Sequence, residues 1–301
     1  MPAPRQTQSF LMQRFEEAGI RPETRHGQNF LIDLNLLDLL VESAALGPKD
    51  VVLEVGTGMG SLTERLAALA GAVVTVEIDS RLYQLAREQL ADRANVVMLL
   101  QDALRNKNNM DDGVLAAVRG EVAKIPGGRF KLAANLPYNV ATPILSNLLL
   151  VDPLPVSLTA TIQKELADRI LAPPGTKDYS ALSIWMQSQC DLHLVRTMPP
   201  QVFWPRPKVH SAILHIVPNA DKRARITDLP YFHQFVRGLF QHRRKLLRGV
   251  LASQLREHLD KPAIDALLTA QQLPADARAE QLPVEALIAL AAAARARGGG
   301  C

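Results

Sequence analysis

The stretch Asn135-Leu-Pro-Tyr138 places an amide, a rigid proline and a phenol directly after an apolar run at residues 130–134. One chemistry that these residue types could serve is attack by an exocyclic amine of a nucleobase. Such an amine is a poor nucleophile, because its lone pair is delocalised into the ring. The Asn135 side-chain oxygen and the carbonyl of Leu136 or Pro137 can accept its two hydrogens and favour a pyramidal nitrogen. Tyr138 offers a flat face on which an extruded base can stack. A proline turn with a packed tyrosine is the alternative, but it does not explain an asparagine at the end of a strand.

A glycine-rich segment, E-x-G-x-G-x-G, begins at Glu54 and includes Gly56 and Gly58. Glycine lets the backbone turn tightly and approach a ligand without a Cβ in the way. A dinucleotide-binding fingerprint requires its third glycine at position 61, which is Ser61, so a dehydrogenase is disfavoured. The spacing suits a nucleoside ligand that has no pyrophosphate.

Two acids stand at corresponding places after the next two apolar runs. Glu77 comes directly after residues 73–76, and its carboxylate can accept both hydroxyl hydrogens of a ribose. Asp102 follows residues 96–100, where it can accept from an adenine amino group. Either acid alone reads as an ordinary loop residue. Together with the glycines they mark the ends of three successive strands, the edge at which open α/β sheets bind ligands.

The elements that must position these residues alternate between strand and helix. Helical spacing covers residues 36–45, 61–70 and 81–90, between apolar runs at 51–55, 73–76, 96–100 and 130–134. This alternation predicts an α/β fold of the Rossmann-like, doubly wound class. Further strands are expected at 157–162, 192–196 and 212–217. Every segment after residue 219 has helical spacing, so we expect an α/β domain at 1–218 and a small all-helical domain at 219–301.

Composition limits the classes of protein that remain. No apolar run among the 301 residues approaches the ~18 that a membrane-spanning helix needs. The only cysteines, Cys190 and Cys301, exclude a disulfide framework and fit a reducing cytoplasm, and no metal site is predicted. Residues 201–260 contain eleven Lys and Arg against four Asp and Glu, a net charge of +7. Such a local excess indicates a polyanionic partner.

The basic residues fall into two groups. Arg206 and Lys208 lie in a proline-stiffened loop between two expected strands. The second group lies within two turns of an expected helix whose buried face is Leu246, Leu247, Val250 and Leu251; its cations are Arg243, Arg244, Lys245 and Arg248. Cations that project together can bind phosphates, which supplies affinity but little sequence discrimination. A merely solvated cationic face is the alternative.

Taken together, these motifs resemble the ribosomal RNA adenine-N6 dimethyltransferases, a family of S-adenosylmethionine-dependent enzymes. The resemblance rests on NLPY followed by N-x-x-x-P, and on GQNFL at 27–31, QKEL at 163–166, K-x-Y-x-x-L-S at 177–183, F-x-P-x-P-K-V-x-S at 203–211 and F-x-x-R-R-K-x-L at 240–247. The chain departs from the usual pattern at four positions: Thr57, Ala141, Ser180 and His210. None of the four removes an expected cofactor ligand.

The resemblance implies a fold, a cofactor and a substrate. S-adenosylmethionine would be bound by Asn29, Leu31, Gly56, Gly58, Glu77, Asp102 and Asn135, with catalysis assigned to Asn135, Leu136, Pro137 and Tyr138. The implied reaction places methyl groups on N6 of two adjacent adenosines near the 3′ end of small-subunit (16S) rRNA during ribosome biogenesis. The expected partner is this RNA within an assembling 30S particle, bound by a cytoplasmic monomer through Arg206, Lys208 and the second basic group.

Two rival functions stay open from the sequence. One is a large-subunit (23S) rRNA adenine-N6 methyltransferase of the macrolide-resistance type, which shares the cofactor motifs; GQNFL and the PKVHS loop favour the small-subunit assignment. The other is a non-catalytic nucleic-acid-binding factor on the same fold. The presence of Gly56, Glu77, Asp102 and Asn135 together argues against it.

Overall fold

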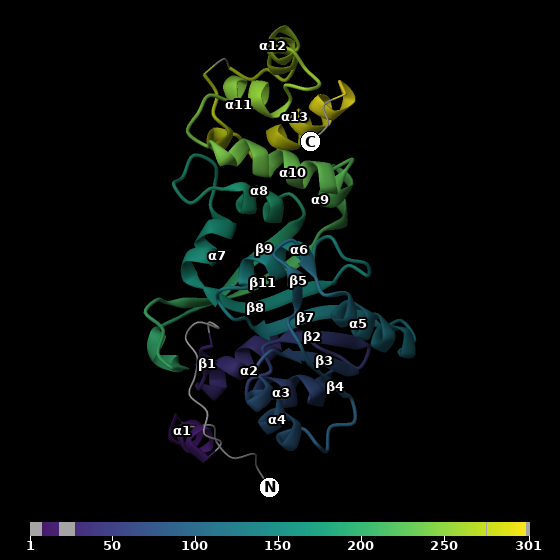
Figure 1. Cartoon of the computed structure of the whole chain (residues 1–301), viewed down its shortest axis with the longest axis vertical. Coiled ribbons are helices and arrows are strands. Elements are labelled where there is room, and N and C mark those ends of the chain that lie inside the picture. Colours follow the sequence, from purple (N-terminus) through teal and green to yellow (C-terminus); the bar gives the residue numbers. More distant parts are fainter. Residues whose placement is uncertain (1–7, 18–27, 275, 299–301) are drawn as a thin grey trace. The chain divides into compact units, whose positions relative to one another are not determined.

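The computed structural model, which describes residues 8–17, 28–274 and 276–298, contains a seven-stranded sheet (Figure 1). Five neighbouring strands are parallel, and β11 then pairs antiparallel with β8. The strands in spatial order are β4 (Val96–Leu100), β3 (Ala72–Glu77), β2 (Asp50–Val55), β7 (Arg129–Asn135), β8 (Ser157–Gln163), β11 (Ser211–Pro218) and β9 (Cys190–Met198). All the strands expected from apolar runs are therefore confirmed.

Burial explains why the central strands read as continuous apolar runs. Every residue of β2 and β3 is buried, as expected for parallel strands that are covered on both faces. Three helices that connect parallel strands pack on them: α3 (Ser61–Leu69), α4 (Ser80–Gln89) and α5 (Asp112–Lys124). The Rossmann-like α/β class predicted from the sequence is confirmed.

The strand order places a crevice at the centre of the sheet. The chain runs outward from β2 through β3 to β4, then returns to form β7 on the other side of β2. Where the order reverses, the helices that follow β2 and β7 lead away in opposite directions and leave a gap at the carboxyl ends of the strands. The glycine segment follows β2 and Asn135 ends β7, so both border this gap.

Several shorter elements complete this part of the chain. Two residue pairs join strand β1 (Phe30–Leu31) to β10 (Phe203–Trp204), and a small hairpin forms directly after Asp102. The remaining elements are α1 (Gln8–Glu17), α2 (Leu34–Ser43), β5 (Leu104–Asn106), β6 (Asn109–Met110), α6 (Ala141–Asn147) and α7 (Lys164–Leu171). None of the described helices is long and apolar enough to cross a membrane.

Contacts divide the chain into two compact units. The first comprises the described residues up to Ala167 together with His193–Val217, and the second comprises Asp168–Leu192 and the chain from Pro218 onward. The second unit is helical and holds α8 (Ala181–Gln187), α9 (Ala220–Ala224), α10 (Leu229–Gln241), α11 (Leu247–Gln254), α12 (Lys261–Ala270) and α13 (Val284–Ala296).

The expected boundary at 218/219 lies within one residue of the point where the chain enters this unit for the second time. The unit also takes in residues 168–192, which the sequence assigned to the first domain. The reason is packing across a long sequence separation. The buried Tyr179 donates its hydroxyl hydrogen to the Leu282 carbonyl at 3.0 Å, and the Trp185 ring packs against the tilted His233 ring with centroids 4.3 Å apart.

Candidate active site

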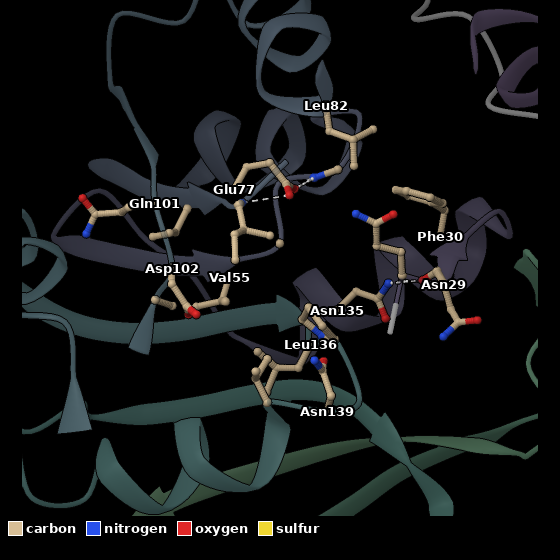
Figure 2. Close-up of a pocket in the computed structure, with 18 residues that line it drawn as sticks. Asn29, Phe30, Val55, Glu77, Leu82, Gln101, Asp102, Asn135, Leu136 and Asn139 are labelled. Carbon is tan, nitrogen blue, oxygen red and sulfur yellow. Dashed lines mark hydrogen bonds between the residues drawn. The ribbon is translucent and has the colours of Figure 1, made fainter. Parts of the chain in front are cut away.

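A pocket opens at the carboxyl ends of β2, β3, β4 and β7, with an empty volume of about 820 Å³ including its open mouth (Figure 2). Segments from five parts of the first unit line it: Gln28, Asn29, Phe30, Val55, Gly56, Gly58, Val76, Glu77, Ile78, Leu82, Gln101, Asp102, Ala103, Asn135, Leu136, Pro137, Asn139 and Val140. The glycines, both acids and Asn135 therefore converge on one site.

The glycine segment needs glycine for both backbone and space. Gly56 and Gly58 have φ of 88° and 56°, in the left-handed region that side chains disfavour. A Cβ on Gly58 would lie 3.0 Å from the Phe30 ring, and one on Gly56 would lie 3.4 Å from the Pro137 ring. A side chain at either position would therefore narrow the pocket as well as strain the turn.

The buried carboxyl group of Glu54 stabilises this turn through hydrogen bonds. Glu54 is fully buried, and its Oε2 accepts hydrogen bonds from the hydroxyls of Thr63 and Thr75, each at 2.6 Å. The Thr75 hydroxyl also bonds that of Thr57 at 2.6 Å. Burial raises the pKa of Glu54 to about 8. Thr57, one of the departures from the family pattern, thus joins a hydrogen-bonded network that ties the glycine turn to β2 and β3.

Glu77 is held rigidly at the end of β3. Its Oε2 accepts the Gly58 N–H at 2.9 Å, and its Oε1 accepts the Ile78 N–H at 3.0 Å (Figure 2). The same Oε1 also accepts the Asp79 N–H at 3.0 Å. Burial raises the pKa of Glu77, while these three donors favour its ionised form. A carboxylate offers about four acceptor positions, so roughly one remains for a ligand in the pocket.

Asp102 follows β4, much as Glu77 ends β3, but its side chain is exposed. Its Oδ1 accepts the Leu104 N–H at 2.9 Å, which fixes the side chain at the start of the β5–β6 hairpin. The residue lines the pocket between Gln101 and the buried Ala103. An exposed carboxylate at this place can accept a hydrogen bond from a ligand amine without a large desolvation penalty.

A hydrogen bond to another described residue orients the Asn135 side chain. Its Nδ2 donates to the Asn29 carbonyl at 2.8 Å, so the amide oxygen is left as the acceptor at the pocket (Figure 2). The Pro137 carbonyl already accepts the Val140 N–H at 3.1 Å. The Leu136 N–H donates to the Thr161 carbonyl, which fixes the backbone at Leu136. Of the two backbone carbonyls proposed as the second acceptor, Leu136 is therefore the better candidate.

Tyr138 does not line this pocket. Its ring is half-buried, and its hydroxyl lies 2.5 Å from the Ser211 hydroxyl at the start of β11. Burial raises the pKa of the Tyr138 phenol above its ordinary value. Tyr138 therefore lies next to Asn135 and Leu136, which form part of the pocket wall, but it does not contribute to the lining of the cofactor pocket.

Leu31 was expected to bind the cofactor but does not line the pocket, and several residues that do line it were not predicted from the sequence. Leu31 is buried in the core opposite Phe203, and its neighbour Phe30 lines the pocket instead, because successive side chains of a strand point to opposite faces. Gly27, the first residue of the GQNFL motif, lies outside the described residues. The lining residues that were not predicted mostly adjoin predicted ones: Gln28, Phe30, Val55, Val76, Ile78, Leu82, Gln101, Ala103, Asn139 and Val140.

Comparison with known proteins places this geometry in a family. Residues 20–290 match the profile of the ribosomal RNA adenine dimethylases. The chain belongs to this family. It is 38% identical over 238 residues to the ribosomal RNA small subunit methyltransferase A of Moorella thermoacetica, covering 79% of this chain and 81% of that protein.

Two solved structures share the fold of this dimethylase. A dimethyladenosine transferase from Plasmodium falciparum aligns with a TM-score of 0.74 and 24% identity over 88% of this chain and 97% of that one. The 23S rRNA methyltransferase ErmE aligns with a TM-score of 0.60 and 25% identity over 88% of this chain and 98% of that one. The first likeness, at this identity, is evidence of the fold alone.

The basic residues of this dimethylase are arranged differently from the sequence expectation. Arg206 and Lys208 are exposed in the loop between β10 and β11, as expected. The turn at 242–246 separates α10 from α11, so Arg243, Arg244 and Lys245 are not on one helix. Leu246, expected to be buried, is 46% exposed because α11 begins only after it.

Two of the four cations in the second group are engaged within the chain. Arg243 bonds the Glu280 carboxylate at 2.6 Å and the Lys177 carbonyl at 2.8 Å. Arg248 pairs through two nitrogens with Asp265. Arg244 and Lys245 are exposed on the turn. The sequence expectation that all four cations project together is therefore wrong for Arg243.

The remaining departures from the family pattern have local explanations. Ser180 precedes α8 with φ of −149°, a conformation open to any residue, and forms a capping box with Ser183. His210 is exposed, and its carbonyl accepts the Lys164 N–H at 2.9 Å. Ala141 is fully buried at the start of α6. Within the described ranges, no three His, Cys, Asp or Glu side chains are grouped to hold a metal ion.

Proposed function

We propose that this chain transfers methyl groups from S-adenosylmethionine to N6 of two adjacent adenosines near the 3′ end of small-subunit rRNA. The observation that carries the proposal is the convergence of Glu77, Asp102 and Asn135 on one pocket at the sheet's switch point. Glu77 can accept a hydrogen bond from the ribose of a nucleoside cofactor, and Asp102 can accept one from its adenine amine. Asn135 can accept one from the amine that is to be methylated.

The pocket fits the cofactor in the chemistry of its walls. Glu77 has roughly one acceptor position left for a ribose hydroxyl, and Asp102 keeps one oxygen for the adenine amine. The exposed Ile78 and the Phe30 ring supply apolar surface for the base and sugar. When bound, S-adenosylmethionine supplies an electrophilic methyl group.

The groups at the end of β7 act on the acceptor. The Asn135 amide oxygen and the Leu136 carbonyl accept the two N6 hydrogens, which localises the nitrogen lone pair for attack. No general base is needed before transfer, since the ammonium product loses its proton readily to water. Tyr138 stacks on the extruded adenine from beside the pocket.

The proposed partner is small-subunit rRNA within an assembling 30S particle, met by a cytoplasmic monomer. Exposed Arg206 and Lys208 on the first unit, and Arg244 and Lys245 on the second, would contact phosphates. The loop that carries the first pair is anchored at both ends, by the pairing of β10 with β1 and by the start of β11. Its cations therefore lose little conformational freedom on binding.

Methyl transfer from labelled S-adenosylmethionine distinguishes the candidate functions. We expect label to enter immature 30S particles and to be absent from 50S particles. Transfer to 50S particles or free large-subunit rRNA alone would favour the macrolide-resistance type. RNA binding with no transfer to any substrate would favour a non-catalytic factor.

A further inference from the structure

The contact between Tyr138 and Ser211 joins two motifs that are 73 residues apart in the chain. Their hydroxyl oxygens lie 2.5 Å apart, a short distance for a neutral hydroxyl pair. Ser211 is fully buried, so water does not compete for its hydroxyl. A tyrosine phenol is protonated at neutral pH, and burial raises the pKa of Tyr138 further, so its hydroxyl can donate to Ser211.

Ser211 is a rigid anchor because the sheet fixes its position. It is the first residue of β11 and lies opposite Gln163 in the antiparallel pair with β8. Strand β8 in turn pairs with β7, where Thr161 lies opposite Asn135. The Lys164 N–H also bonds the carbonyl of His210, the residue before Ser211. The pairing of β11, β8 and β7 therefore fixes the position of the Ser211 backbone relative to that of Asn135.

Tyr138 has no such support from regular structure. It lies in the turn between β7 and α6, two residues beyond the last hydrogen bond that ties this segment to β8. Its ring can turn about two side-chain torsions unless the far end is held. The bond to Ser211 supplies that second point of attachment. A planar group fixed at both its backbone and its hydroxyl has one orientation relative to the Asn135 amide.

We propose that Ser211 is a positioning residue for methyl transfer, whose hydroxyl sets the orientation of the Tyr138 ring against the acceptor base. The inference rests on the proposed function, because the ring matters only if a base is bound there. It assigns the serine at the end of the PKVHS motif a role in the reaction in addition to its place in the strand.

The second methyl transfer is the step most sensitive to this orientation. After the first transfer, N6 carries one hydrogen, and only the rotamer that directs it to an acceptor is productive. A ring with more freedom lets the base adopt more orientations, and fewer of them satisfy this stricter requirement. Loss of the Ser211 hydroxyl is therefore expected to raise the fraction of N6-monomethyladenosine among the products.

The experiment compares Ser211→Ala, Tyr138→Phe and the double variant on the RNA substrate of the wild-type protein. Each single change removes the same hydrogen bond, so each should lower kcat by about 3- to 10-fold. The double variant should be no worse than either single one, since the two changes share one interaction. KM for S-adenosylmethionine should stay unchanged, because Tyr138 does not line the cofactor pocket.

Ser157→Ala is the matched control. Ser157 is the first residue of β8, is 6% exposed, and its hydroxyl has no hydrogen-bond partner among the described residues. It should leave kcat and the product ratio unchanged. If Ser211→Ala lowered only the melting temperature, with wild-type kcat and product ratio, the proposal would be overturned. Multiplicative losses in the double variant would also overturn it. A wild-type protein that transfers no methyl group would instead refute the proposed function.

Discussion

Replacing Glu77 by alanine tests the ribose assignment with a magnitude that follows from the structure. Three backbone N–H groups already occupy the carboxylate, at 2.9, 3.0 and 3.0 Å. About one of its four acceptor positions is then left for a ribose hydroxyl. A hydrogen bond to a charged group contributes ~1.5–3 kcal/mol, so Glu77→Ala should weaken S-adenosylmethionine binding about 10- to 150-fold. The change also leaves three N–H groups without their acceptor, which should lower the melting temperature.

Isothermal titration calorimetry on the folded variant measures this loss directly, with Asp79→Ala as control. Asp79 lies two residues on and caps α4 by accepting from the N–H groups of Arg81 and Leu82. Its loss should reduce stability by ~1 kcal/mol, as for other caps, and leave cofactor affinity unchanged. Equal affinity in wild type and Glu77→Ala would refute the ribose assignment. An equal loss of affinity in Asp79→Ala would show that general loosening of this corner is responsible.

Three further predictions follow from the site and its surroundings. Asn135→Ala should reduce transfer by ~10²–10³ while calorimetry shows only a modest change in cofactor affinity; transfer within tenfold of wild type would count against the acceptor role. Arg244→Ala should lower the salt dependence of RNA binding by about one phosphate contact, whereas Arg248→Ala, whose cation is paired with Asp265, should change it less; equal slopes for both would contradict this. Because the pKa of Glu54 rises from 4.5 to about 8 on folding, the folded chain keeps a proton that the unfolded chain loses, so the free energy of unfolding should fall as pH rises through that window. Urea unfolding of Glu54→Gln should show a weaker fall, and an unchanged pH dependence would rule out this source.

The central part of the fold and the three hydrogen-bond acceptors of the cofactor pocket could be predicted from the sequence for one physical reason. Buried parallel strands read as continuous apolar runs, and their carboxyl ends meet at one edge of the sheet. Residues placed directly after those runs therefore had to converge. Glu77, Asp102 and Asn135 all line the pocket as the pattern required.

Features that depend on distant parts of the chain could not be predicted in the same way. Which side chain of the two-residue strand β1 faces the pocket is decided by its pairing with β10, far along the chain. The hydroxyl contact of Tyr138 spans 73 residues, and the ion pair of Arg243 with Glu280 spans 37. The extent of the helical unit is also set by such contacts, since Tyr179 bonds the Leu282 carbonyl. No local pattern contains this information.

The central claim is that the pocket dimethylates adenine N6 in small-subunit rRNA, and product analysis tests it most directly. Immature 30S particles are incubated with the protein at saturating S-adenosylmethionine, and the rRNA is digested to nucleosides for mass spectrometry. We predict N6,N6-dimethyladenosine as the end product, at two positions near the 3′ end of the RNA. N6-monomethyladenosine as the only product, or methylation of a different atom, would contradict the account.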